Sequence, residues 1–343
     1  MRRPRPRHRR MADVTANTRT LDDIAAQLPP APARRTLARL TGHGMGALVA
    51  LVLLVVANAL FTPNFATAGN LWNVLLQVST VVLVAVGMTF VIATGGIDLS
   101  IGSVMAIAGA IAATQLDRGI AVAVALALLV AVAVGTLNGL LVARSRIQPI
   151  VVTLATLIAG RGLAQVLSDD GQLVTIRESA FLLLGRARLG PLPVPVLVAA
   201  VVVAVAAFAL RAMPFGRYVL ASGGNAAAAR LSGVPVQRTL VGVYALSGAL
   251  AGLAGLLEAS RLGASDAAKI GLNIELDAIA AVVVGGTALT GGRATVLGTV
   301  VGALVMQVIA TSFNMLLVPY AWSLALKAAI ILLAVALQRP RRV

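Results

Sequence analysis

The chain has 343 residues, of which 59% are hydrophobic and only 12% are charged. Soluble domains are typically about half apolar and about a quarter charged, so this composition excludes an ordinary water-soluble globule and indicates a chain that faces lipid. The net charge of +16 comes almost entirely from arginine. Many arginines lie at the chain ends and in short loops, which predicts membrane topology rather than nucleic-acid binding. With no cysteine and only two histidines, disulfides are excluded and no metal site is expected.

Residues 1–40 are rich in Arg and Pro, and we expect a disordered, basic cytoplasmic tail there. The first apolar run begins only near Met45, too far along the chain for a secretory signal peptide. Met11 is an alternative start, and the sequence leaves that choice open. We expect residues 41–343 to form the transmembrane domain.

Apolar runs follow one another along this domain. A membrane-spanning helix needs about 20 mostly apolar residues, and open strands would leave unpaired backbone groups in lipid. We therefore predict an all-α, polytopic membrane helix bundle with about ten transmembrane helices. The predicted runs are 45–61, 75–94, 101–116, 119–142, 150–168, 192–210, 239–260, 275–290, 295–315 and 320–338.

The arginines predict an orientation, because basic residues favour cytoplasmic loops. With the N-terminus inside, the arginine-bearing segment 211–238 and the basic C-terminus also lie inside, while the uncharged loops 62–74 and 316–319 lie outside. The bias is incomplete, since the outer loops 169–191 and 261–274 also carry basic residues. We predict a plasma-membrane protein with both termini in the cytoplasm.

Small residues spaced four apart predict close helix contacts, because they let two backbones approach. Chance spacing in a glycine-rich chain is the alternative. The pairs are Gly135 and Gly139, Gly248 and Gly252, and Gly298 and Gly302.

A polar break separates two apolar runs at residues 95–103. Ionisable groups near the membrane are expensive and usually functional, so Gly95, Gly96, Asp98 and Ser100 are candidates for the solute path or for a flexible helix break. The alternative is structural: the glycines end one helix, and Asp98 or Ser100 caps the next. The two interpretations are compatible.

Residues 285–292 echo this break, and paired glycine interruptions point to substrate paths in transporters. By our span count the two segments share an orientation, which a simple five-plus-five inverted repeat would not give, so the origin of the echo stays open. Upstream, Glu275 and Asp277 either favour a helix dipole or contact solute, and the partner of Lys327 is open. The candidates within the echo are Gly285, Gly286, Thr287 and Thr290.

A short cytoplasmic helix is predicted after Asn225, a good N-cap, with alanines that favour helix and Gly233 as a stop. A helix this short is marginal alone, so we expect it to pack on a motor subunit as a coupling helix. A stiff, solvated loop is the alternative. The coupling residues are Asn225, Ala228, Arg230, Leu231, Ser232 and Gly233.

Nucleotide-binding and catalytic motifs are missing. The sequence lacks the glycine-rich phosphate loop ending in Gly-Lys-Ser/Thr, and no catalytic residue set is apparent. We expect no enzyme activity and no cofactor, so ATP would be used by a partner subunit.

At these stretches the sequence resembles the ribose-type permease family of ABC importers, over most of residues 45–338. Two departures stand out. The family usually shows Pro-Pro where this chain has Gln148-Pro149, and it often carries Glu where Ala226 and Ala227 stand, which predicts a partner ATPase matched to this chain. The motifs that carry the resemblance are residues 95–103, 148–156, 223–233 and 276–302.

The resemblance implies a pore made with a second permease copy or homologue, a cytoplasmic ABC ATPase on the coupling helices, and an extracytoplasmic solute-binding protein. ATP would drive alternating access for a sugar or sugar-like small molecule, by shifting populations between inward- and outward-open states. An ion-coupled secondary transporter is the main alternative, with Asp98 as its candidate buried acid. A membrane-embedded enzyme would need a catalytic cluster that the sequence does not show.

Overall fold

The computed structural model describes residues 44–145, 147–168 and 170–338, which fall within one compact unit. The predicted disordered tail, residues 1–40, lies outside the described residues. Within the described ranges the chain is mostly helical, and every predicted apolar run contains a helix, which confirms the all-α class. These helices are α3 (Gly44–Phe61), α4 (Ala68–Ala93), α5 (Ile101–Gln115), α6 (Ile120–Arg144), α7 (Pro149–Leu167), α9 (Val194–Ala212), α12 (Val236–Leu262), α13 (Ile274–Val284), α14 (Val296–Met315) and α15 (Tyr320–Gln338).

Short strands and short helices lie between the apolar helices, and the sequence predicted only one of them. The strands form two small two-stranded sheets, one of which joins segments about 90 residues apart in the chain. Two-residue strands form the antiparallel pairs β1 (Val174–Thr175) with β4 (Ala264–Ser265) and β2 (Arg188–Leu189) with β3 (Leu192–Pro193). The short helices are η2 (Leu116–Arg118), α8 (Ser179–Arg186), α10 (Pro214–Gly224) and α11 (Ala226–Leu231), of which only α11 was expected.

The number of membrane-crossing helices is only partly settled. Within the described residues six helices are long and apolar enough to cross a bilayer, namely α4, α6, α7, α9, α12 and α14. A count of ten is therefore not confirmed. Two of the predicted spans are too short: α5 has 15 residues and α13 has 11. At 1.5 Å per residue they reach about 22 and about 16 Å, against a hydrocarbon core of about 30 Å.

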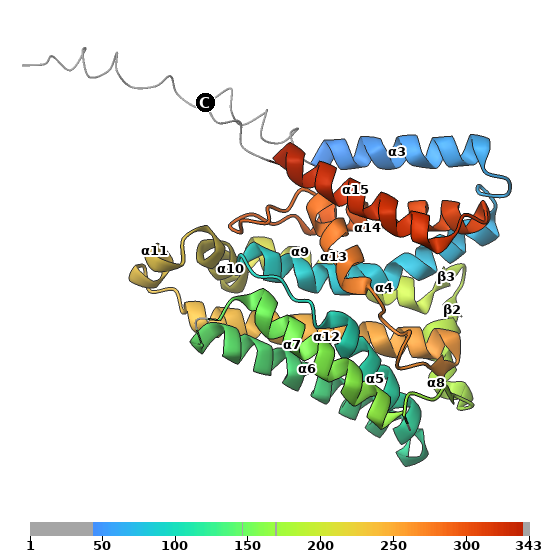
Figure 1. Ribbon diagram of the computed structural model, residues 1–343, viewed down its shortest axis with the longest axis horizontal. Coiled ribbons are helices and arrows are strands. Elements are labelled where there is room, and N and C mark those ends of the chain that lie inside the picture. The colour runs from blue at the N-terminus through green and yellow to red at the C-terminus, as the bar shows by residue number, and fades with distance from the viewer. Residues whose placement is uncertain (1–43, 146, 169, 339–343) are drawn as a thin grey trace, which may run out of the picture. The chain divides into compact units, whose positions relative to one another are not determined.

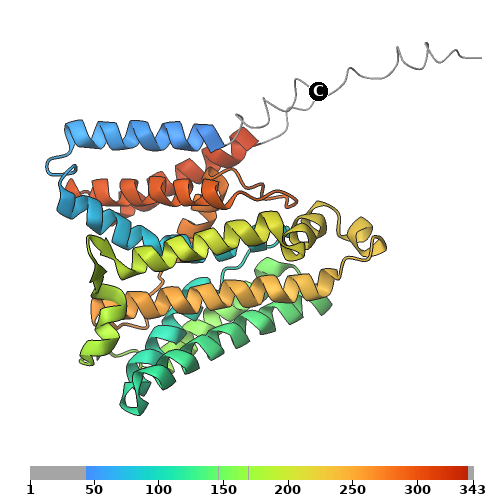
Figure 2. The same cartoon turned by 180° about the vertical axis from the view of Figure 1, so that it is seen from behind.

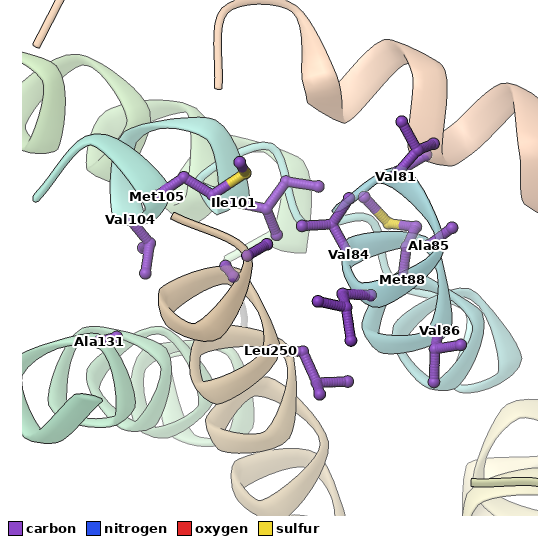
Figure 3. Packing of buried hydrophobic residues seen from close by; sticks show 14 of the residues in the cluster. Val81, Val84, Ala85, Val86, Met88, Ile101, Val104, Met105, Ala131 and Leu250 are labelled. Carbon is purple, nitrogen blue, oxygen red and sulfur yellow. The ribbon is translucent and has the colours of Figure 1, made fainter. Parts of the chain in front are cut away.

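The buried centre is built from α4, α5 and α12. Residues 78–93 of α4 and 101–112 of α5 are buried almost without interruption, so neither helix presents a polar face to solvent. In Figure 3, Val84 and Met88 of α4, Ile101 of α5 and Leu250 of α12 converge on one region. Such all-round burial explains why these helices show no amphipathic stripe.

Helix α6 and helix α12 pack through the predicted glycines. A Cβ on Gly135 would lie 3.1 Å from the Cα of Gly248 and would also clash with the carbonyl oxygen of Tyr244. One turn away, a Cβ on Gly139 would lie 2.7 Å from the Cα of Val241. The glycine pair of α6 and the glycine pair of α12 therefore lie at one close contact between the two helices. This contact confirms the predicted small-residue contacts.

The third glycine pair joins α14 to α13. A side chain on Gly298 would clash with the carbonyl oxygen of Gly285, and one on Gly302 would clash with that of Ala281. Nearby, the hydroxyls of Thr89 in α4 and Thr299 in α14 lie 2.8 Å apart in the buried interior. These contacts fix α13 and α14 beside α4.

The two ends of the bundle carry different elements. Figure 1 shows α10 and α11 at one end and α8, β2 and β3 at the opposite end. Figure 2, seen from behind, shows the same separation along the long helices. We refer to these as the α11 end and the α8 end.

Candidate translocation and coupling sites

The first predicted break follows α4. Gly95 adopts φ +82°, a left-handed conformation that favours glycine. Its N–H donates to the carbonyl of Ile92 at 2.8 Å, and the N–H of Gly96 donates to that of Val91 at 3.2 Å. Gly96 must also lack a side chain, since a Cβ there would lie 2.6 Å from the hydroxyl of Tyr244. The predicted role of these glycines in ending a helix is confirmed.

Asp98 lies in the interior of this break and is 1% exposed. One carboxylate oxygen accepts from the N–H of Ser100 at 3.0 Å and from its hydroxyl at 2.6 Å. The other accepts from the hydroxyl of Ser247, near the middle of α12, at 2.8 Å. Asp98 therefore satisfies an amide just ahead of α5, as a cap does, while Ser100 makes no such side-chain bond. A role in the solute path stays a prediction.

The hydrogen bonds continue from Ser100 to two more helices. The Nδ2 of Asn138 in α6 donates to the Ser100 hydroxyl at 2.9 Å, and the hydroxyl of Thr156 in α7 donates to the Oδ1 of Asn138 at 2.6 Å. We call Asp98, Ser100, Asn138, Thr156 and Ser247 the buried polar network. Sequence reasoning missed the last three, although polar side chains inside apolar runs are a usable signal.

The second break follows α13 and repeats the design of the first. Gly286 adopts φ +89°, and its N–H donates to the carbonyl of Val283 at 3.0 Å. Thr287 is fully buried and accepts from the N–H of Thr295 at 3.2 Å. Thr290, in contrast, is exposed. The glycines thus end α13 at Val284, six residues before the end of the predicted run.

The two breaks touch each other and α10. The N–H of Gly292 donates to the carbonyl of Ala93, the last residue of α4, at 2.9 Å. A Cβ on Gly291 would lie 2.9 Å from the nitrogen of Gly95 and from the carbonyl oxygen of Gly223, and one on Gly223 would lie 2.7 Å from the nitrogen of Gly292. The two echoing segments and the end of α10 therefore meet backbone to backbone. We call this contact the glycine junction.

The predicted coupling helix forms as α11. The Oδ1 of Asn225 accepts from the N–H groups of Ala227 at 3.1 Å and Ala228 at 3.0 Å, as an N-cap should. Gly233 adopts φ +82°, and its N–H donates to the carbonyl of Arg230 at 3.0 Å. Both predicted ends of this helix are confirmed.

Residues on one side of α11 are open. Leu231 is 91% exposed, and Ala228, Arg230 and Ser232 are exposed, whereas Ala229 faces the protein and is 6% exposed. An isolated exposed leucine in so short a helix contributes nothing to its own fold. A docking role fits this arrangement and stays a prediction.

Lys327 has a partner that the sequence left open. Its Nζ lies 2.7 Å from the Oδ1 of Asp277, and the two side chains are 11% and 24% exposed. The ion pair joins α15 to the first turn of α13. Asp277 is therefore occupied by a structural contact.

Together the long apolar helices, the interrupted helices and the glycine contacts define a multi-pass helical membrane protein. The profile described as "Branched-chain amino acid transport system / permease component" matches residues 70–335. The chain belongs to this family of permease components. No solved structure matches the chain.

Several characterised permeases are similar over nearly the whole chain. The ribose import permease protein of Haemophilus influenzae is 40% identical, covering 84% of this chain and 90% of its own length. The L-arabinose ABC transporter permease protein of Azospirillum brasilense is 36% identical, covering 97% and 98%. The galactofuranose transporter permease protein of Escherichia coli is 39% identical, covering 87% and 90%. The expected resemblance to sugar-importer permeases is confirmed.

Proposed function

We propose that this chain is the transmembrane permease subunit of an ABC importer that moves a sugar or sugar-like solute into the cell. A separate ATPase drives alternating access, and a separate binding protein delivers the solute. The relatives are import permeases for ribose, L-arabinose and galactofuranose by name. The observation that carries the proposal is α11, a capped helix that directly follows α10 and whose Leu231 is 91% exposed.

In this proposal, movement of the motor subunit reaches the two breaks through the contacts of α10. This helix directly precedes α11, and its Gly223 lies at the glycine junction against Ala93 and Gly292. A motor subunit that displaces α11 thereby displaces both breaks at once. The absence of side chains at the junction leaves backbone atoms to transmit the movement, with no flexible group between them.

We place α11 and both chain termini in the cytoplasm, with α8 on the outside. In this arrangement α3 and α15 also cross the bilayer, while α5 and α13 reach only part of the way. The solute moves between this chain and a second permease copy or homologue, because the five residues of the buried polar network are already bound to one another.

Reconstitution tests the function. The chain is placed in proteoliposomes with its ATPase and binding protein, and uptake of radiolabelled D-ribose and L-arabinose is measured. We expect uptake of one of them that needs ATP and both partners, and no ATP hydrolysis by the purified chain alone. Uptake without the ATPase would refute the proposal.

The coupling assignment has its own variants. Leu231→Asp and Ala228→Asp each place a charge on the exposed side of α11, and we expect loss of ATPase co-purification with normal folding. Leu317→Asp is the matched control, because Leu317 is 89% exposed but lies between α14 and α15. Normal transport by both α11 variants would exclude this docking site.

An ion-coupled secondary transporter is the second candidate, favoured by the complete burial of Asp98. It predicts uptake driven by a proton or sodium gradient in the absence of ATP. The same vesicles, energised with a gradient instead of ATP, separate the two mechanisms.

A further inference from the structure

Two short helices start at one place inside the bundle. Gly102, the second residue of α5, lies against Gly271 and Glu275 at the start of α13: a Cβ on Gly102 would lie 2.8 Å from the Oε2 of Glu275, and one on Gly271 would lie 2.6 Å from the carbonyl oxygen of Gly102. Helix α5 leaves this point alongside Gly255 of α12, and α13 leaves it toward the break at Gly285. Discontinuous helices that begin inside the membrane commonly flank substrate sites.

Arg161 reaches the same place from α7. Its guanidinium donates to the carbonyl oxygens of Ala267 at 2.9 Å, Ile270 at 2.7 Å and Gly271 at 3.4 Å, all in the segment that leads into α13. The Nη2 atom lies 3.5 Å from the position that a Cβ on Gly102 would take. Arginine within a membrane helix is costly and usually functional, and sequence reasoning missed it although it interrupts an apolar run.

Glu275 faces Arg161 without closing a salt bridge. It is 8% exposed, and its Oε2 is buried with no hydrogen-bond partner among the described residues. The ion pairs within the described part of the chain are Lys269–Asp266 and Lys327–Asp277, so the Arg161 and Glu275 groups stay more than 4.0 Å apart. A buried carboxylate oxygen without a donor is destabilising, so this oxygen is an acceptor that water or a solute hydroxyl can satisfy.

We propose that Arg161 and Glu275 form the contact that holds a neutral, polyhydroxylated solute inside the membrane. The carboxylate accepts a hydrogen bond from one hydroxyl of the solute, and the guanidinium donates to the oxygen of a neighbouring hydroxyl. One positive and one negative group together match an uncharged ligand. Gly102 and Gly271 contribute no side chains beside them. The inference rests on the proposed function and names the residues that would bind the substrate.

The site is within reach of a path along the surface of the chain. Arg161 is half-buried, and a Cβ on the next residue, Gly162, would meet no atom within 4 Å. Arg161 therefore sits at the edge of an open face of α7. Entry requires that the guanidinium exchange its backbone carbonyls for solute hydroxyls, and that the backbones at Gly102 and Gly271, which touch in this structure, move apart.

Glu275→Gln in the complete importer tests the site, because the amide keeps the shape of the side chain but loses its charge. We expect uptake of whichever sugar the wild type moves, D-ribose or L-arabinose, to fall about ten-fold, because a neutral amide oxygen accepts a weaker hydrogen bond than a carboxylate does. ATPase stimulation by the loaded binding protein should stay near the wild-type level. Glu178→Gln, an exposed acid at the start of α8, is the matched control and should change neither rate.

Parallel loss of uptake and of stimulated ATPase would show a structural role and overturn the site, as would unchanged uptake. Uptake by the wild type that does not need the ATPase would refute the proposed function instead, so the two failures are distinguishable.

A second measurement avoids removing either charge. The chain contains no cysteine, so Gly162→Cys adds a single thiol to this chain next to Arg161, at an exposed position where a Cβ meets no atom within 4 Å. In the importer turning over ATP, we expect saturating sugar to slow methanethiosulfonate labelling several-fold, but not to slow that of the control Ser145→Cys at the exposed end of α6. Equal labelling with and without sugar would overturn the site.

Discussion

Replacing Gly135 by alanine adds one methyl group where the backbones of α6 and α12 touch. The new Cβ would lie 3.1 Å from the Cα of Gly248 and would clash with the carbonyl oxygen of Tyr244. Nonbonded carbon atoms prefer about 3.5–4.0 Å, so the helices must separate by about 0.5–1 Å. Overpacking of this kind destabilises by about 1–3 kcal/mol.

Gly162→Ala is the matched control, because it adds the same group to a helix where nothing lies within 4 Å. Both variants gain about 1 kcal/mol of helix propensity, so the difference between them isolates the packing term. For a domain of about 300 residues that difference corresponds to about 2–5 °C in melting temperature.

The assay is thermal unfolding of the purified chain in detergent. All variants are heated at one fixed rate, because membrane proteins often unfold irreversibly, and size-exclusion chromatography then measures the folded fraction that remains. We expect Gly135→Ala to melt below the wild type and Gly162→Ala to melt at or above it. If Gly135→Ala melts no lower than Gly162→Ala, the backbone contact between α6 and α12 is not as described.

Three further outcomes are expected. Asn225→Ala removes two cap hydrogen bonds and should destabilise α11 by about 1 kcal/mol, weakening ATPase co-purification less than a charge at its exposed side does; full co-purification with Leu231→Asp but not with Asn225→Ala would contradict this order. Lys327→Met leaves Asp277 without its partner at 2.7 Å and should destabilise by about 1–3 kcal/mol, while the double variant with Asp277→Leu should recover most of the loss in a thermal melt. Thr89→Val removes the 2.8 Å contact with Thr299, whose hydroxyl still donates to the carbonyl of Thr295 at 3.1 Å, and should destabilise by about 0.5–1.5 kcal/mol. Thr299→Val should cost a similar amount and the double variant less than the sum of the two; strictly additive losses in a thermal melt would argue against the bond between the two hydroxyls.

Local features could be predicted from the sequence, because their causes are local. Hydropathy located the apolar helices, spacing located the glycine contacts, and residue type located both ends of α11. Each depends on groups within about one or two helical turns. The end of α13 was missed because two nearly neutral glycines lower the hydropathy of an apolar run only slightly, so the run seemed to continue through Gly285 and Gly286 to residue 290.

The candidate site depended on distant partners and could be predicted only in part. Asp98 was singled out, but Ser247 lies 149 positions away along the chain and Asn138 bonds to Ser100 from 38 positions away. Arg161 was overlooked because the carbonyl groups to which it donates lie more than 100 positions later in the chain. No periodicity in the sequence encodes such pairings, which arise only when the helices pack.

The glycine faces of α6 and α12 have a consequence for motion. A contact made of main-chain atoms has no rotamers to exchange, so it cannot yield gradually by repacking. We therefore expect the two helices to travel as one rigid body, and we expect the left-handed glycines at residues 95 and 286 to act as hinges. A label on α6 and one on α12 should keep a constant separation throughout the transport cycle, while the separation of either from α13 changes.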